Sequence, residues 1–390
     1  MKKVAIIGAG TSKFGNRNDV NVSELAFEAV KPSLIDAGVT GKDVEFMALG
    51  TAGAGAFYEE LIPAVVIAEY CGLTKTGLTR CEAACASGSA AFFNAYLAIA
   101  SGEAELTMAV GLEKMRQIDT LTAMEWIGRA GHYFWEFHNF GLTFPAYYAL
   151  YANAHMARFG TTEEDLALVA VKNHKYAAIN PVAHLQNKIT VDDVLSSMVI
   201  ASPLKLLDCC PVTDGSTSII LASEEKVKEL KIDSPVWVAG IGHSSGTANL
   251  SKRPDYVGLE ASVYAARRAY RRAGVTPRQI DVAEVHDCFT IAEIMAYEDI
   301  GLCKKGEGAK LIREGQTEIG GKTPVNVDGG LKAKGHPIGT TGCSMIYELA
   351  KQLKEEAVEK GRQVPLKNYI ALAHNIGGTG HYCYVTILRR

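Results

Sequence analysis

The sequence lacks any run of 18 consecutive apolar residues, about the length that a membrane-spanning helix needs. Its first eight residues hold only a short apolar segment without a cleavage site, so we expect no secretion signal. An excess of one charge is also lacking, because 40 Lys and Arg face 43 Asp and Glu. No basic run is interleaved with aromatic residues, which argues against nucleic-acid binding. These absences predict a cytoplasmic protein that binds neither membranes nor nucleic acids.

Paired C-x-x-C motifs are absent although the chain contains nine cysteines. The odd number and the irregular spacing do not form a disulfide framework, which suits a reducing compartment. A structural metal site would need a different spacing, and a set made of Cys81, Cys85, His286 and Cys288 stays only as an alternative. We therefore expect no bound metal and no resident cofactor.

A dinucleotide-binding fingerprint is incomplete at the start of the chain. Val4 to Ile7 reads as a buried strand followed by Gly8-Ala9-Gly10, but position 13, where the third glycine would stand, is Lys13. We expect no nucleotide site there.

What the chain does contain is an alternation of strand and helix patterns. Val22 to Ala37 reads as an amphipathic helix that ends at Gly38, and Val44 to Leu49 as the next strand. Pro235 to Gly242 then opens a second series much as Val4 to Gly10 opened the first. The pattern predicts a parallel α/β sheet in each of two similar halves, residues 1–230 and 231–390.

The alternation breaks down between about residues 113 and 202, which predicts a subdomain inserted in the first half. This segment is rich in aromatic residues, which could line an acyl channel or pack subunits and domains together. The aromatic residues are Tyr133, Phe134, Trp135, Phe137, Phe140, Phe144, Tyr147, Tyr148 and Tyr151.

Cys85 is the candidate nucleophile. It lies among small residues, immediately before an apolar run from Ala90 to Ala100 that predicts an enclosed helix. A thiol at a helix N-terminus faces unpaired N–H groups and the positive end of the helix dipole, so we expect the pKa of Cys85 to fall. A buried cysteine that merely fills a core is the alternative reading.

Three stretches of the second half carry further candidate side chains. They are Glu284 to Phe289, which follows a predicted strand, Lys334 to Gly339, and His374 to Gly380 before the last strand. Singly, a histidine near a turn or a glycine cluster is commonly structural. Together with Cys85, two histidines, a second thiol and exposed backbone N–H groups predict acyl-transfer chemistry.

The sequence resembles the thiolase superfamily over its whole length. The stretches that carry the resemblance are CASGS around Cys85, HDCF at 286–289, GGLKAKGHPIGTTG at 329–342 and HNIGGTG at 374–380. HDCF together with GHP is similar to the branch of sterol-carrier-type thiolases and archaeal acetyl-CoA C-acetyltransferases. The resemblance implies an α/β thiolase fold, in which two βαβαβαββ halves form a five-layered αβαβα sandwich.

The resemblance also implies the catalytic roles. His336 would accept the proton of Cys85, which attacks acetyl-CoA, and Cys288 would take a proton from a second acetyl-CoA. His286 would hold a water at the enolate oxygen, and the N–H groups of Cys85 and Gly377 would bind the oxyanion. Many thiolases carry their second cysteine where this chain has Asn375, so Cys288 is the matching thiol. The expected reaction joins two acetyl-CoA molecules into acetoacetyl-CoA and CoA.

Substrate contacts and partners are further expectations from the resemblance. The pantetheine arm would meet His155, Met156, Ser244 and Ser245, and the candidates for the phosphates are Lys252, Arg253, Lys332 and Lys334. A homodimer or homotetramer is implied, as is a complex with hydroxymethylglutaryl-CoA synthase through a small zinc-ribbon and OB-fold protein, in the mevalonate pathway. The alternatives are a degradative sterol-carrier-type 3-ketoacyl-CoA thiolase, a ketoacyl synthase, and a non-catalytic subunit of an acyl-CoA assembly.

Overall fold

The computed structural model describes residues 2–357 and 361–390. The first half contains β1 (Val4–Thr11), α1 (Val22–Ala37), β2 (Phe46–Gly50), α2 (Ala54–Phe57), α3 (Pro63–Tyr70), β3 (Gly77–Cys81), α4 (Ser87–Ser101), β4 (Leu106–Glu113), β7 (Gly215–Ser223) and α9 (Glu224–Glu229). The second half contains β8 (Val236–Ser245), α10 (Glu260–Ala273), β9 (Val282–Val285), α11 (Thr290–Asp299), α12 (Gly308–Arg313), α13 (Thr341–Leu353), β10 (Ile370–Gly377) and β11 (Tyr382–Arg389).

The strand order shows the repeat that the sequence predicts. The order is β3-β2-β4-β7-β1-β8-β11-β10-β9, with the first five strands from one half and the last four from the other. The expected parallel sheet is mixed in each half. The strands β3, β2 and β4 run parallel in the first half, as do β9 and β10 in the second, and the next two strands in each half pair antiparallel. The halves join where β1 pairs with β8, at Ala5 with Trp237 and Ile6 with Val236.

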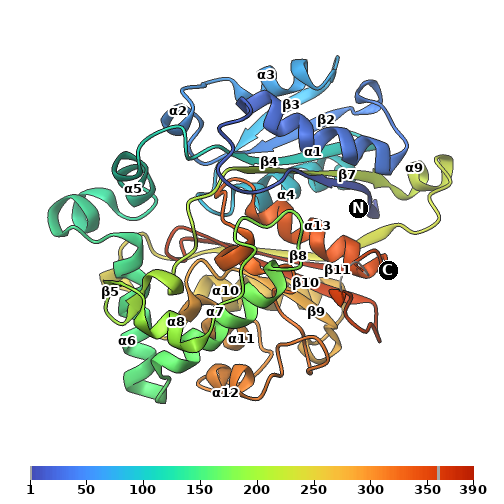
Figure 1. The fold of residues 1–390 in the computed structure, drawn as a ribbon. Coiled ribbons are helices and arrows are strands. Elements are labelled where there is room, and N and C mark those ends of the chain that lie inside the picture. The colour runs from blue at the N-terminus through green and yellow to red at the C-terminus, as the bar shows by residue number, and fades with distance from the viewer. Residues whose placement is uncertain (1, 358–360) are drawn as a thin grey trace.

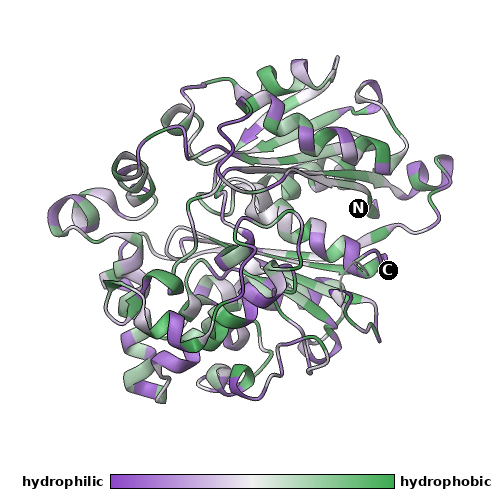
Figure 2. Ribbon diagram, viewed as in Figure 1, coloured by the Kyte–Doolittle hydropathy of each residue, from purple (hydrophilic) through white to green (hydrophobic). Residues whose placement is uncertain are grey.

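The elements stack in five layers, which confirms the predicted fold class. Figure 1 shows α1 and α3 above the strands of the first half, α4 and α13 between the strands of the two halves, and α10 and α11 below the strands of the second half. Hydrophobic residues fill the strands of both sheets, whereas α1 mixes both kinds of residue (Figure 2). The two middle helices are therefore enclosed by protein.

Local signals fix where the outer helix α1 begins and ends. The side chain of Asn21 accepts hydrogen bonds from the N–H groups of Ser23 and Glu24, and Glu24 bonds back to the Asn21 N–H. Gly38 ends the helix at a φ of 67°, in the left-handed region that glycine adopts readily.

The inserted segment is helical rather than irregular. It contains α5 (Thr120–Gly128), α6 (Phe144–Phe159), α7 (Glu163–Ala177), α8 (Val191–Ser196), and the short strands β5 (Val199–Ala201) and β6 (Leu204–Lys205). Tyr147, Tyr148 and Tyr151 of α6 are fully buried, while Phe134, Trp135 and Phe140 ahead of it are exposed. The aromatic cluster thus divides between the core and the surface. No helix of the described residues is long and apolar enough to cross a membrane.

Candidate active site

The two middle helices bring their N-terminal ends together. A Cβ at Gly88 of α4 would lie 3.1 Å from the Gly342 nitrogen, and a Cβ at Gly342 of α13 would lie 2.2 Å from the Ser89 nitrogen. Only glycines allow this close approach between the two backbones. The segments that precede the two helices, which hold Cys85 and His336, consequently converge.

Cys85 lies at a strained bend just ahead of α4. The preceding residue, Ala84, has a φ of 49°, which is uncommon for a residue other than glycine. The helix itself begins at Ser87, two residues after Cys85, rather than at the thiol. The bend separates the thiol from the helix and directs it toward a cavity.

Cys85, His286, Cys288 and His336 line the same cavity, whose volume is about 330 Å³. One ring nitrogen from each histidine and the sulfur of Cys85 lie within 4.8 Å of one another. The two imidazoles meet edge to face, with 5.1 Å between their centroids. Apolar side chains such as Met115, Phe144 and Ile338 form most of the remaining wall. The structure therefore gathers the four predicted side chains around one apolar hollow.

The expected fall in the pKa of Cys85 is wrong for the resting protein. Cys85 is 6% exposed, and burial raises its pKa to about 12, although the Gly378 N–H that points at the sulfur lowers it. Desolvation of the thiolate outweighs the helix N-terminus, which starts two residues later. The thiol is neutral until a base removes its proton.

Both histidines of the cavity are neutral as well. Burial, then Lys334, lowers the pKa of His336 to about 3, and burial, then His336 and His374, holds the pKa of His286 well below its usual value. Nδ1 of His336 lies 2.7 Å from the Thr341 hydroxyl, which donates to the Pro337 carbonyl. The Thr341 oxygen can thus accept the Nδ1 proton, which leaves Nε2 of His336 as an acceptor for the thiol.

Cys288 follows β9 and is 5% exposed. Burial raises the pKa of its thiol well above the usual value, as do the neighbouring thiols of Cys210 and Cys85, whereas the hydroxyl of Tyr148 lowers it. Tyr148 also stacks on Phe289 at 4.6 Å between ring centroids. Tyr148 therefore packs next to the Cys288 thiol.

The third motif of the second half forms a strand end rather than a loop. His374 to Gly377 belong to β10, and a Cβ at Gly377 would lie 2.1 Å from the carbonyl oxygen of Ala83. Gly378, one residue further, lines the cavity and directs its N–H at Cys85. Sequence reasoning named Gly377 and missed Gly378, because the chain pattern does not specify which N–H faces the thiol.

The four residues that were predicted to contact the pantetheine arm do not line the cavity of Cys85. His155 is fully buried, with Nδ1 2.8 Å from Thr161 and Nε2 3.2 Å from Glu298. Met156 is its neighbour in α6, and neither residue lines the cavity of Cys85. Ser244 and Ser245 end β8, where they pair with Cys383 and Tyr382 of β11. The structure does not bring these four residues to the thiol.

Two of the four phosphate candidates are excluded by burial. Lys332 and Lys334 are 1% and 4% exposed, and Lys334 forms an ion pair with Asp328. Both amino groups lie in the core, where CoA phosphates have no access.

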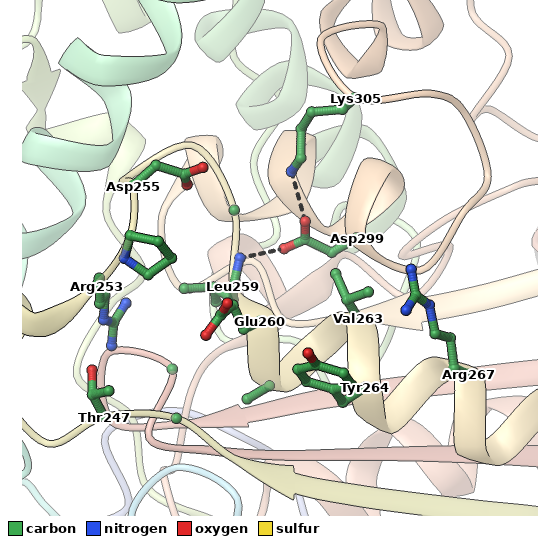
Figure 3. Close-up of a pocket in the computed structure, with 15 residues that line it drawn as sticks. Thr247, Arg253, Asp255, Leu259, Glu260, Val263, Tyr264, Arg267, Asp299 and Lys305 are labelled. Atoms are coloured by element: carbon green, nitrogen blue, oxygen red, sulfur yellow. Dashed lines mark hydrogen bonds and ion pairs between the residues drawn. The ribbon is translucent and has the colours of Figure 1, made fainter.

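Arg253 lines a second cavity of about 250 Å³ beside α10 (Figure 3). Its guanidinium contacts the hydroxyls of Tyr151 and Thr379. Across the cavity Asp299 binds Lys305 at 2.6 Å and accepts the N–H of Leu259, so these charges are satisfied internally. Cys85 does not line this cavity, which makes it a separate feature of the described chain.

Comparison with known proteins agrees with this geometry. Residues 4–225 match the thiolase N-terminal domain, and residues 242–390 match the thiolase C-terminal domain-like family. The chain belongs to the thiolase family. A protein named acetyl-CoA acetyltransferase from Methanothermobacter thermautotrophicus is 42% identical over 390 residues, covering all of both chains. Sterol carrier protein 2 of Homo sapiens is 34% identical over 97% of this thiolase and 70% of its own length.

A solved structure titled "Ltp2-ChsH2(DUF35) aldolase" superposes on this thiolase with a TM-score of 0.84 and 27% identity. The match covers 99% of this chain and 97% of the other. The two proteins therefore share one fold, which includes the two middle helices and the loops that precede them.

Proposed function

We propose that this thiolase is an acetyl-CoA C-acetyltransferase, which condenses two acetyl-CoA molecules into acetoacetyl-CoA and CoA. The observation that carries the proposal is the convergence of Cys85, His286, Cys288 and His336 on one apolar cavity. The 42% identical archaeal relative, named acetyl-CoA acetyltransferase, supports the choice of substrate.

The first half-reaction transfers an acetyl group to Cys85. Nε2 of His336 accepts the thiol proton as the sulfur attacks the thioester carbonyl, and the same proton then passes to the leaving CoA thiolate. The N–H groups of Cys85 and Gly377 are the expected oxyanion donors, and the Gly378 N–H, which points at the sulfur, is a further candidate. A single donor of this kind contributes on the order of 3 kcal/mol.

The second half-reaction forms the carbon–carbon bond. Cys288 gives its thiol proton to Nε2 of His336 and, as the resulting thiolate, takes a proton from the methyl group of a second acetyl-CoA. The enolate carbon then attacks the acetyl group on Cys85. Collapse of the adduct breaks the bond to Cys85, whose thiolate takes the proton back from His336, and releases acetoacetyl-CoA. The enolate oxygen needs donors in an apolar site, and His286 and His336 are the polar side chains available in the cavity. The proposed chemistry uses the two thioesters and needs no metal or other cofactor.

Mass spectrometry of the intact protein after addition of acetyl-CoA tests the proposal. We expect one acetyl group per chain, on the peptide that contains Cys85, and no adduct on the Cys85→Ser variant. An unmodified parent protein, or an acetyl group on another cysteine with Cys85 free, would contradict the assignment of the nucleophile.

A degradative 3-ketoacyl-CoA thiolase is the second candidate, and one observation favours it. The cavity wall is formed largely by apolar side chains, with Ile200 and Leu206 at exposures of 39% and 50%, and a two-carbon acetyl group does not need so much apolar surface. A series of 3-ketoacyl-CoA substrates of increasing chain length separates the two, because an acetyl-specific enzyme loses kcat/KM as the chain grows.

The cellular setting is also a proposal. We infer a cytoplasmic enzyme at the first step of the mevalonate pathway that associates with hydroxymethylglutaryl-CoA synthase through a small zinc-ribbon and OB-fold protein. The structural relative paired with a DUF35 protein supports an assembly of this kind. Condensation of two thioesters is uphill, so a partner that consumes the product at once would draw the reaction forward. Co-purification of the three proteins at native expression levels tests the association.

A further inference from the structure

The side-chain amide of Asn375 connects the two sides of the active site. Its Nδ2 lies 3.1 Å from the carbonyl oxygen of Cys85 and 3.1 Å from Nδ1 of His286, and its Oδ1 accepts a hydrogen bond from the Ser89 hydroxyl at 2.8 Å. Asn375 is fully buried, so these contacts have no competition from solvent. One amide therefore touches the nucleophile's backbone, a catalytic imidazole and the start of α4.

The chemistry of these neighbours fixes which way the amide points. The carbonyl oxygen of Cys85 can only accept a hydrogen bond, so the atom that faces it must be the NH₂ group. A flipped amide would set two acceptor oxygens against each other. The Ser89 hydroxyl, which can donate, faces the opposite atom, Oδ1.

The amide orientation in turn determines the protonation of His286. Nδ2 has two hydrogens, one for the Cys85 carbonyl and one for Nδ1 of His286. Nδ1 must then carry the lone pair, and the single proton of the neutral ring resides on Nε2. Nε2 is buried and has no hydrogen-bond partner among the described residues, and the ring lines the cavity of Cys85.

We propose that Asn375 is a positioning residue that holds His286 as the Nε2–H tautomer, so that His286 is a fixed hydrogen-bond donor to the cavity. The two histidines then differ in kind: His336 presents a lone pair to the thiol, and His286 presents a proton. The use of that proton at the enolate oxygen rests on the proposed function, whereas the tautomer itself does not.

A second consequence concerns metal ions. Cys85, His286 and His336 resemble the Cys-His₂ sets that bind Zn²⁺, since their ligand atoms lie within 4.8 Å of one another. Zinc requires a lone pair on each ligating nitrogen and a thiolate, with the thiol proton released to the buffer. An Nε2–H on His286 removes one of the three ligands. Asn375 therefore keeps this cluster a poor zinc site.

The tautomer is measured directly on the full-length parent protein. Two-bond nitrogen–proton correlations of protein labelled with ¹⁵N-histidine separate Nε2–H from Nδ1–H rings, and comparison with a His286→Gln variant assigns the signal. We expect His286 as the neutral Nε2–H form throughout pH 6 to 8. An Nδ1–H ring, or a protonated one, overturns the proposal.

Exchange of the amide for a carboxylate should invert the arrangement. In Asn375→Asp the carboxylate accepts a proton from Nδ1, so Nε2 becomes a lone pair, and carboxylate–histidine pairs of this kind strengthen zinc binding by about 10–100-fold. Titration with zinc chloride should show at least tenfold tighter binding by Asn375→Asp than by the parent. The double variant with His286→Gln should lose the gain, and parent-like zinc affinity in a folded Asn375→Asp protein contradicts the proposal.

Kinetics distinguish this role from simple support of the fold. We expect Asn375→Asp to slow release of the first CoA from acetyl-CoA as well, because the carboxylate no longer donates to the Cys85 carbonyl, but to slow condensation by about 100-fold more, the loss typical of one oxyanion donor. Equal losses in both half-reactions would assign Asn375 a structural role instead. If the variant does not fold, the nitrogen–proton measurement on the parent decides alone.

Discussion

Neutral histidines beside a neutral thiol are the main electrostatic feature at the residue scale. Burial lowers the pKa of His336 to about 3 and that of His286 well below its usual value, so neither ring gains a proton as the pH falls through 6.5. We therefore expect kcat/KM to stay flat between about pH 5 and 8 and to decline only in stronger acid. A profile of initial rates across this range checks the expectation, and a loss of activity with a midpoint near pH 6.5 would contradict it.

The second thiol offers a test that separates the two half-reactions. Cys288→Ala removes the base for carbon deprotonation but leaves Cys85 and His336 in place, so the variant should still form the acetyl adduct. Condensation should fall by 10²–10⁴-fold, the usual contribution of a positioned base. Intact mass and acetoacetyl-CoA formation are measured on the same sample. Product formation at the parental rate would assign the base to another group.

Some residues could be read from the sequence and others could not. Cys85, His286, Cys288 and His336 carry their chemistry in their side chains and stand in recognisable motifs, and the structure gathers them. The pKa of Cys85 and the contact from Gly378 depend on burial and on a neighbour almost 300 positions away, which no local pattern specifies. Tertiary packing determined both.

At the scale of elements, prediction succeeded where local signals are strong. Val22 to Ala37 was expected as a helix and is α1, because Asn21 and Gly38 cap it. No helix was predicted within the insert, yet it contains α6 and α7. Helix α6 buries its three tyrosines on one face but exposes Leu150 on the other, so the contrast between an apolar and a polar face that marks an amphipathic helix is weak there.

The contact between α4 and α13 gives a prediction for the element scale. A methyl group at Gly342 would lie 2.2 Å from the Ser89 nitrogen and 2.7 Å from Oδ1 of Asn375, so Gly342→Ala must push the two helices apart. We expect a loss of about 1–3 kcal/mol in the free energy of unfolding, together with slower acetylation of Cys85.

Urea denaturation and the rate of acetyl adduct formation provide the two measurements. Gly55→Ala in α2 is the matched control, since its Cβ would meet only Leu61, at 3.4 Å, an ordinary contact distance. Gly342→Ala with the stability and acetylation rate of that control would show that the two helix starts are not tightly packed.

At the scale of the whole molecule, the edge strand β3 is the exposed end of the nine-stranded sheet in the described chain. β3 pairs only with β2, and two of its five residues are exposed and two more are partly exposed. Helix α4 packs beside β3 and, further along, exposes Leu97 at 40% in a cavity that Val4 of β1 and Trp237 of β8 also line. Natural proteins seldom leave such an edge next to apolar surface uncovered. We propose that β3 and α4 form the self-association face of the expected homodimer or homotetramer.

A charge at Leu97 tests the position of that face. Leu97→Glu adds a carboxylate that would lose its hydration in the interface, so the variant should shift to monomers at concentrations where the parent is an oligomer. Ile35→Glu is the matched control, because Ile35 is 70% exposed on the outer helix α1, on a separate layer of the molecule. Light scattering coupled to gel filtration gives the mass of each protein. If Leu97→Glu keeps the parental mass, or if Ile35→Glu dissociates as readily, subunits meet through another surface.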